Sequence, residues 1–211
     1  AKLADLVAIG ARGIKVPKLL GLALRDVDDR LVAVDDSRLD PIWQMAAKLH
    51  VPVAIHVGDP VAFWQPVDDR NERIDELRLH PEWSYFGSDA FSHAELMAQQ
   101  QRLFARHPTT QFIGVHVAGW PEDLGAVTKM LLGHPNLVVD IAARVPELGH
   151  HPAAEVRAFF VRFADRILFG TDLGVAPQGV MLGAPLAWPE GPADVERFFD
   201  ATYRFLQTDQ R

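Results

Sequence analysis

The sequence of 211 residues contains no cysteine. This absence excludes disulfide frameworks, thiolate metal sites and cysteine nucleophiles, and because it fits a reducing compartment, a cytoplasmic location is expected. Basic residues are outnumbered, with 21 Lys+Arg against 28 Asp+Glu and a net charge of -7, which argues against a nucleic-acid partner. No apolar run approaches the roughly 18 residues needed to span a bilayer, so no membrane partner is expected either.

The length and composition are those of one globular domain. Hydrophobic residues make up 48% of the chain and charged residues 23%, values that exclude a disordered or low-complexity protein. The chain opens with Leu3, Leu6 and Val7 at helical spacing, and it stops directly after another helical stretch. We therefore expect residues 1–211 to form a single, partial domain whose flanking segments are missing.

Five short segments rich in Ile, Val, Leu and Phe are predicted to be strands. They span residues 13–16, 51–57, 111–117, 136–142 and 166–171. Amphipathic segments separate them, and each opens with a helix-start signal. These signals are Asp40-Pro41, Ser92 with Glu95 as a capping box, Pro121, and Pro152. Strands that alternate with helices predict a parallel sheet.

The interval between the second and third predicted strands is too long for an ordinary strand–helix unit. It contains an insertion, residues 59–91, which we interpret as a lid-like segment over a site. Within this insertion, Arg70, Arg73 and Arg78 alternate with acidic residues, a pattern typical of a solvated face.

Side chains of a strand alternate between the two faces of a sheet, which divides each predicted strand into two sets. The apolar set is expected to pack on helices and comprises Ile14, Val16, Val53, Ile55, Ile113, Val115, Leu137, Val139, Ile167 and Phe169. The opposite set comprises Gly13 with Lys15, Ala54 with His56, Gly114 with His116, Val138 with Asp140, and Gly170 with Asp172. A doubly wound open sheet would be apolar on both faces, whereas small residues beneath a ring of ionisable ones are typical of a barrel interior. The pattern predicts an α/β fold of the (β/α)8 barrel class with a site at the carboxyl ends of the strands.

Each ionisable residue at a strand end also has a structural interpretation when it is considered alone. A single histidine is commonly a hydrogen-bonded core residue, and a single aspartate commonly caps the next loop. Two histidines and two aspartates at equivalent inward positions favour a metal site instead, because buried ionisable groups need partners.

Five segments of the sequence resemble the amidohydrolase superfamily, in particular its amidohydrolase-related (amidohydrolase 2) branch of metal-dependent hydrolases and decarboxylases. These segments are GIKV, PVAIHVGDP, QFIGVHVAGWPEDL, NLVVDIAARVPELG and RILFGTDL, and they cover most of residues 10–175. The resemblance implies a TIM barrel of which strands 4 to 8 and their helices are present, truncated at the N-terminus.

The resemblance also implies roles for individual residues. His56 matches a metal ligand, and Asp172 matches the residue that binds metal and takes a proton from water. His116 matches the histidine that orients or protonates substrate, or binds a second ion in two-metal members. Lys15 falls where two-metal members have a carboxylated lysine, which in this branch is usually not a ligand. The family's first-strand His-x-His pair has no counterpart, because no histidine precedes His50, and two ligands do not complete a catalytic site.

The expected mouth of the barrel is rich in tryptophan. Trp64, Trp83, Trp120 and Trp188 lie on predicted loops there, either as the lining of a pocket for a ring-bearing or apolar substrate or as packing for the insertion. Arg144, after the seventh strand, is placed to receive a carboxylate.

The reaction expected from these residues is hydrolysis of an amide, ester or lactone bond in a small, ring-bearing substrate. A divalent ion, Zn²⁺ or alternatively Mn²⁺, would activate the water, with Asp172 and His116 as the catalytic side chains. Two alternatives stay open: non-oxidative decarboxylation of an aromatic acid, and a non-catalytic barrel scaffold that lacks the His-x-His pair. Five strands of a barrel leave two unpaired edges, so association into a homo-oligomer, or misfolding, is also expected.

Overall fold

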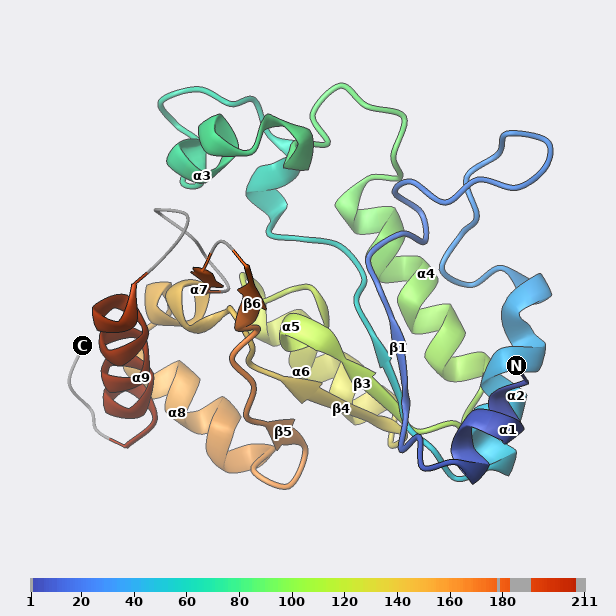
Figure 1. Ribbon diagram of the computed structural model, residues 1–211. Coiled ribbons are helices and arrows are strands. Elements are labelled where there is room, and N and C mark those ends of the chain that lie inside the picture. Colours follow the sequence, from blue (N-terminus) through green and yellow to red (C-terminus); the bar gives the residue numbers. More distant parts are fainter. Residues whose placement is uncertain (1, 178, 183–190, 208–211) are drawn as a thin grey trace.

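The computed structural model describes residues 2–177, 179–182 and 191–207. Its centre is a parallel five-stranded sheet in the order β1-β2-β3-β4-β5 (Figure 1). The strands are β1 (Ile14–Val16), β2 (Val53–Ile55), β3 (Phe112–Gly114), β4 (Leu137–Asp140) and β5 (Ile167–Leu168). The parallel sheet and its sequential strand order are the arrangement that the alternating pattern predicts.

The helices that follow these strands carry the predicted start signals, with one exception. They are α2 (Asp40–Lys48), α4 (His93–Arg106), α6 (Leu124–Gly133) and α8 (Ala153–Arg162). Ser92 accepts a hydrogen bond from the N–H of Glu95, which completes the capping box at α4. The expected start of α6 at Pro121 is wrong, because Asp123 accepts the N–H of Ala126 and so makes Leu124 the first helical residue.

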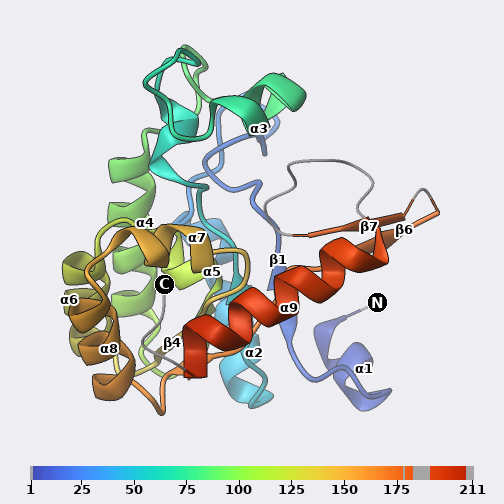
Figure 2. The same ribbon diagram turned by 90° about the vertical axis from the view of Figure 1, so that its left-hand side faces the viewer.

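The core lies between the sheet and these helices, and Figure 2 shows α4, α6 and α8 along one side of the sheet. Side chains of alternate strand residues are fully buried there, including those of Val53, Ile55, Phe112, Leu137 and Val139. The opposite face of the sheet is more open, since Ala54, Ile113 and Val138 are only half-buried and Lys15 is exposed.

The register corrects the predicted faces of the third strand. Ile113 pairs with Ala54 and Val138, and Gly114 pairs with Ile55 and Val139. Paired residues of a parallel sheet point to the same face, so Ile113 lies on the open face and Gly114 on the helix face, the reverse of the expectation. A Cβ atom at Gly114 would come within 2.7 Å of the Cβ atom of Ala118, which explains why this position on the helix side is a glycine.

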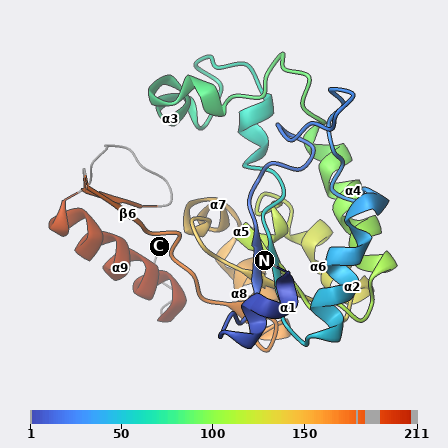
Figure 3. The same cartoon turned by 45° about the vertical axis from the view of Figure 1, so that its right-hand side comes forward.

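The remaining elements surround the sheet. They are α1 (Leu3–Ala8), η1 (Ser37–Leu39), η2 (Val61–Trp64), α3 (Ile74–Leu79), η3 (Pro81–Trp83), α5 (Val115–Ala118), α7 (Val145–His150), the antiparallel pair β6 (Gly174–Ala176) and β7 (Gly179–Met181), and α9 (Pro192–Gln207). Figure 3 shows α1 beside β1 and α9 at the opposite end of the molecule from α2 and α4. In Figure 1 the insertion, which contains α3, lies above the end at which β1 and β2 leave the sheet. Among the described residues, no helix combines the length and apolarity that a membrane crossing requires.

Candidate active site

A cavity of about 220 Å³ lies at the carboxyl ends of the strands, beneath the insertion. Five of the residues singled out from the sequence line it, namely His56, Trp83, His116, Arg144 and Asp172. These residues come from the ends of four strands and from the insertion. Lys15 is exposed and does not belong to this lining.

His56 and His116 form the histidine pair of the cavity. Their ring centroids are 4.3 Å apart and the rings are nearly perpendicular, at 76°. The Nε2 atom of His56 is buried, and among the described residues it has no hydrogen-bond partner. The Nδ1 atom of His116 lies 2.7 Å from the carbonyl oxygen of Ala142, an acceptor, so Nδ1 carries the proton and Nε2 presents a lone pair. This Nε2 lies 3.7 Å from Oδ2 of Asp172.

A left-handed turn, not the strand alternation, brings His116 to the cavity. His116, Val117 and Ala118 have φ values of 61°, 56° and 55°, a conformation that is uncommon for residues with a Cβ atom and especially for a β-branched one. Gly119 continues the turn at φ 73°, where a Cβ atom would lie 2.1 Å from the carbonyl oxygen of Val57. Such strain persists only where surrounding contacts hold it, and it is concentrated at functional sites.

Asp140 supplies the contacts that hold this turn. Its Oδ1 accepts hydrogen bonds from the backbone N–H groups of His116, at 2.9 Å, and Ala142, at 3.1 Å. The same Ala142 residue accepts the ring proton of His116, so one carboxylate positions both the backbone and the side chain of that histidine. Burial raises the pKa of Asp140 against the lowering effect of these two N–H groups. Asp140 therefore matches the structural interpretation of a strand-end aspartate, in which the carboxylate caps the following loop.

The electrostatics of the cavity keep His116 neutral. Burial is the largest cause, and the positive charge of Arg144 and the neighbouring His56 add to it, lowering the pKa of His116 to about 2. A neutral His116 with its proton on Nδ1 acts as a hydrogen-bond acceptor or a ligand at Nε2.

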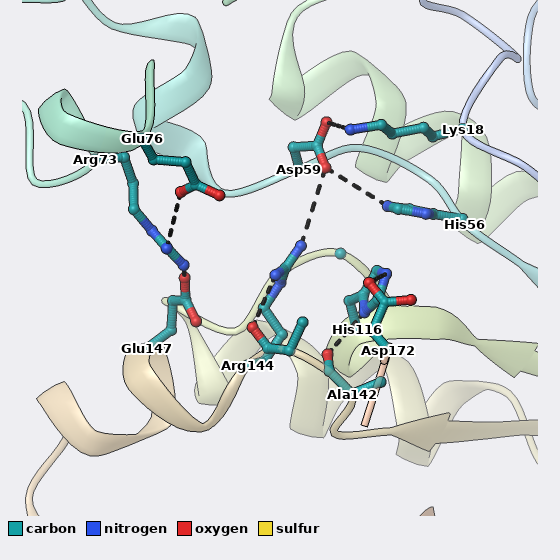
Figure 4. A network of polar contacts seen from close by, with 12 residues as sticks. Lys18, His56, Asp59, Arg73, Glu76, His116, Ala142, Arg144, Glu147 and Asp172 are labelled. Carbon is teal, nitrogen blue, oxygen red and sulfur yellow. Dashed lines mark hydrogen bonds and ion pairs between the residues drawn. The ribbon is translucent and has the colours of Figure 1, made fainter. Parts of the chain in front are cut away.

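Asp59 is the centre of a polar network that the strand pattern does not predict (Figure 4). Its carboxylate lies 2.7 Å from Nζ of Lys18 and accepts the hydroxyl of Tyr85 at 3.0 Å. Its other oxygen lies 3.6 Å from Nε2 of His56 and 4.0 Å from Nη2 of Arg144. Burial would raise the pKa of Asp59, but the nearby His56 and Lys18 outweigh it and hold this pKa well below its usual range. The sequence contains one signal that could have identified Asp59 as a site residue: it lies three residues after His56, at the start of the insertion.

Arg73 corrects the interpretation of the insertion's arginines as a solvated face. Its side chain is only 14% exposed and forms ion pairs with Glu76, at 3.0 Å, and with Glu147 of α7 (Figure 4). Arg70 and Arg78 are 90% and 61% exposed, so the interpretation holds for those two. A buried ion pair thus connects the insertion to the segment after β4.

Of the described tryptophans at the mouth, Trp83 lines the cavity. Its ring stacks on that of His80, with centroids 3.9 Å apart. Trp64 donates its ring N–H to the carbonyl oxygen of Phe91, and Trp120 packs edge-on against His93. Trp64 and Trp120 do not line the cavity, so both match the alternative interpretation, in which these tryptophans pack the insertion. Trp188 lies outside the described residues.

The donor set fits a divalent ion in part. Two imidazole Nε2 atoms, one unpartnered and one held unprotonated, are suitable ligands for Zn²⁺ or Mn²⁺. However, no three His, Asp or Glu side chains of the described segments are grouped so that they could hold an ion. The described segments therefore do not form a complete metal site by themselves.

Comparison with known families decides the assignment. The model of a family described as amidohydrolase matches residues 1–202. The chain belongs to the amidohydrolase family. Members of this family are generally metal-dependent enzymes, which agrees with the partial donor set, and the sheet is that of a partial TIM barrel.

Several solved structures are similar to the chain. An uncharacterized TIM-barrel protein from Bordetella bronchiseptica is 19% identical, with a TM-score of 0.47 over 99% of this chain and 62% of that one. Dihydroorotase from Campylobacter jejuni is 15% identical, with a TM-score of 0.49 over 98% of this chain and 62% of that one. IDCase from Metarhizium anisopliae, in apo form, is 15% identical, with a TM-score of 0.50 over 100% of this chain and 57% of that one. The chain thus spans less than two thirds of the length of these proteins. No curated protein matches it.

Proposed function

We propose that this chain carries part of the active site of a metal-dependent hydrolase that cleaves an amide, ester or lactone bond in a small substrate. The supporting observation is the buried Nε2 of His56, a residue of the same cavity lining as His116 and Asp172. This atom has no partner within hydrogen-bond distance in the described segments, since Oδ1 of Asp59 is 3.6 Å away. A buried polar atom without a partner is costly, and a neutral imidazole nitrogen is a common ligand of Zn²⁺.

His56 and Asp172 would hold the ion, Zn²⁺ or Mn²⁺, together with ligands from outside the described residues. A bound divalent ion supplies a Lewis acid and lowers the pKa of water to about 7. Asp172 would accept a proton at Oδ2, since its side chain is half-exposed and lines the cavity. His116, whose Nδ1 proton is committed to Ala142, would accept a hydrogen bond from the substrate at Nε2.

Two further parts of the proposal concern the surroundings of the site. The insertion, residues 59–91, would act as a lid, since Asp59, Arg73 and Trp83 all reach the cavity from it. β1 and β5 are the edges of the described sheet, and unpaired edges of this kind favour association with a second copy of the chain.

Metal titration tests the proposal at the level of binding. Calorimetry of the chelator-treated protein should detect weak binding of Zn²⁺ or Mn²⁺, which His56→Ala abolishes. His150→Ala is the matched control, because that side chain is 68% exposed and lies outside the cavity lining. Equal binding by the protein and by His56→Ala would remove the metal role of His56.

Product analysis tests the reaction class. Aromatic esters and lactones are incubated with the metal-loaded protein in water that carries a heavy oxygen isotope, and hydrolysis places that isotope in the product. Release of CO2 from a hydroxybenzoate without isotope incorporation would instead identify a decarboxylase. If neither product forms and no metal binds, the chain is a non-catalytic scaffold.

A further inference from the structure

Arg144 is the one cation in the cavity lining whose guanidinium or ammonium group lacks a carboxylate within hydrogen-bond distance, among the residues that the structure describes. Lys18 is paired with Asp59 at 2.7 Å, and Arg73 is paired with Glu76 and Glu147. In Arg144, Nη1 donates to the carbonyl oxygen of Ala143, Nη2 lies 4.0 Å from Asp59, and Nε has no partner in the described part of the chain.

The burial of Arg144 makes this arrangement expensive. Only 6% of its side chain is exposed, and desolvation, the largest influence, lowers its pKa although the guanidinium stays charged. A buried cation needs a closely bound anion to offset the loss of water. Asp59 does not fill this role, because its Oδ1 lies 4.0 Å from Nη2 of Arg144, beyond hydrogen-bond distance, and its Oδ2 receives Lys18 and Tyr85.

We propose that the cavity binds a substrate that carries a carboxylate, and that Arg144 is the group that receives it. This inference rests on the proposed function for the identity of the site and adds the substrate class. A guanidinium binds a carboxylate through two parallel hydrogen bonds, and such charge-assisted pairs are about twice as strong as neutral ones. Two of the three carboxylates in the described lining are already paired, Asp59 with Lys18 and Glu76 with Arg73. The third, Asp172, is half-exposed, so solvent screens its charge.

The rest of the lining indicates the remainder of the substrate. Trp83 presents an aromatic wall that is held by its stack on His80 and by Phe63, 6.5 Å away between ring centroids. Drug-sized ligands occupy pockets of roughly 300–1,000 Å³, so a cavity of about 220 Å³ suits a smaller molecule. A carboxylate attached to a single ring meets both conditions.

Binding of benzoate, compared with that of the neutral benzamide, tests this inference without any turnover. The experiment uses ligand-observed NMR on the chelator-treated protein, so a failure of the hydrolase proposal does not affect it. Benzoate should bind more tightly than benzamide, and Arg144→Gln should weaken benzoate binding by about tenfold to a hundredfold while changing benzamide little. Arg70→Gln, at a side chain that is 90% exposed, is the matched control.

Arg144→Lys keeps the positive charge but loses the two parallel N–H donors of the guanidinium, so it should retain part of the preference for benzoate. It also provides the test if Arg144→Gln does not fold, as judged by circular dichroism. Equal binding of benzoate and benzamide, absence of benzoate binding, or unchanged benzoate binding in both Arg144 variants would overturn the proposal.

Discussion

Replacing Arg73 by methionine should destabilise the protein far more than the same replacement of the exposed Arg70 or Arg78. The change leaves Glu147 and Glu76, whose side chains are 2% and 8% exposed, without their cation. Breaking a buried ion pair by removing one partner costs about 3–5 kcal/mol of unfolding free energy, because an uncompensated charge stays buried. A solvated arginine would contribute only about 0–1 kcal/mol.

Urea unfolding monitored by tryptophan fluorescence measures this difference, since Trp83 lies in the same insertion. Arg70→Met and Arg78→Met are controls of identical chemistry at exposed positions and should stay within about 0.5 kcal/mol of the parent protein. Adding Glu147→Gln to Arg73→Met should return part of the loss, because it removes one of the two stranded charges.

The pH dependence provides a second check on the same variant. Burial raises the pKa of Glu76, and Arg73 is the strongest opposing charge, so its removal raises this pKa further. A carboxyl that binds its proton more tightly in the folded state loses stability as pH rises. The loss in Arg73→Met should therefore be larger at neutral than at mildly acidic pH. A loss no larger than that of Arg70→Met at neutral pH would refute the buried-pair reasoning.

Three other substitutions test single features of the fold. Asp140→Ala should leave two buried N–H groups without an acceptor, at a cost of about 1–3 kcal/mol each, whereas Asp140→Asn keeps an oxygen acceptor. Nitrogen NMR of His116 should show that the Asn variant keeps the Nδ1–H form and that the Ala variant loses it. Identical spectra in both variants would contradict the positioning role of Asp140. Gly119→Ala should lower stability by about 1–3 kcal/mol or more, because the added Cβ atom would collide with the carbonyl oxygen of Val57. Gly133→Ala should be neutral or stabilising, because its Cβ atom would meet no atom within 4 Å. Equal shifts of the two variants in thermal unfolding would contradict the role of the Val57 contact. Ser92→Ala should cost about 1 kcal/mol by removing the cap of α4, and an unchanged melting temperature would show that the cap is dispensable.

Local patterns in the sequence were sufficient for the order and direction of the elements. Apolar runs separated by amphipathic segments predicted the parallel sheet, and Ser92 with Glu95 predicted the start of α4, because each signal depends on residues within one or two turns of each other. His56, Asp172 and Arg144 could likewise be assigned to the mouth, since a residue at the carboxyl end of a parallel strand reaches the same edge as its neighbours.

The third strand shows where that reasoning stops. Alternation placed His116 on the inward face by counting from Gly114, whereas the register turns Gly114 toward the helices and the left-handed turn returns His116 to the cavity. A one-residue error in phase reverses every side chain of a strand. The turn itself depends on a hydrogen bond to Asp140, which is distant in sequence.

What the sequence determined by itself was therefore the set of elements and the edge of the sheet at which ionisable side chains gather. The tertiary structure decided how those side chains are paired. Charge alternation made Arg73 equivalent to Arg70 and Arg78, and only the packing of the insertion against α7 buries it beside Glu147. Asp59 likewise becomes the centre of a network because Lys18 and Tyr85 converge on it from separate segments. The energy of a charged group depends on its burial and its partners, and neither is a property of the local sequence.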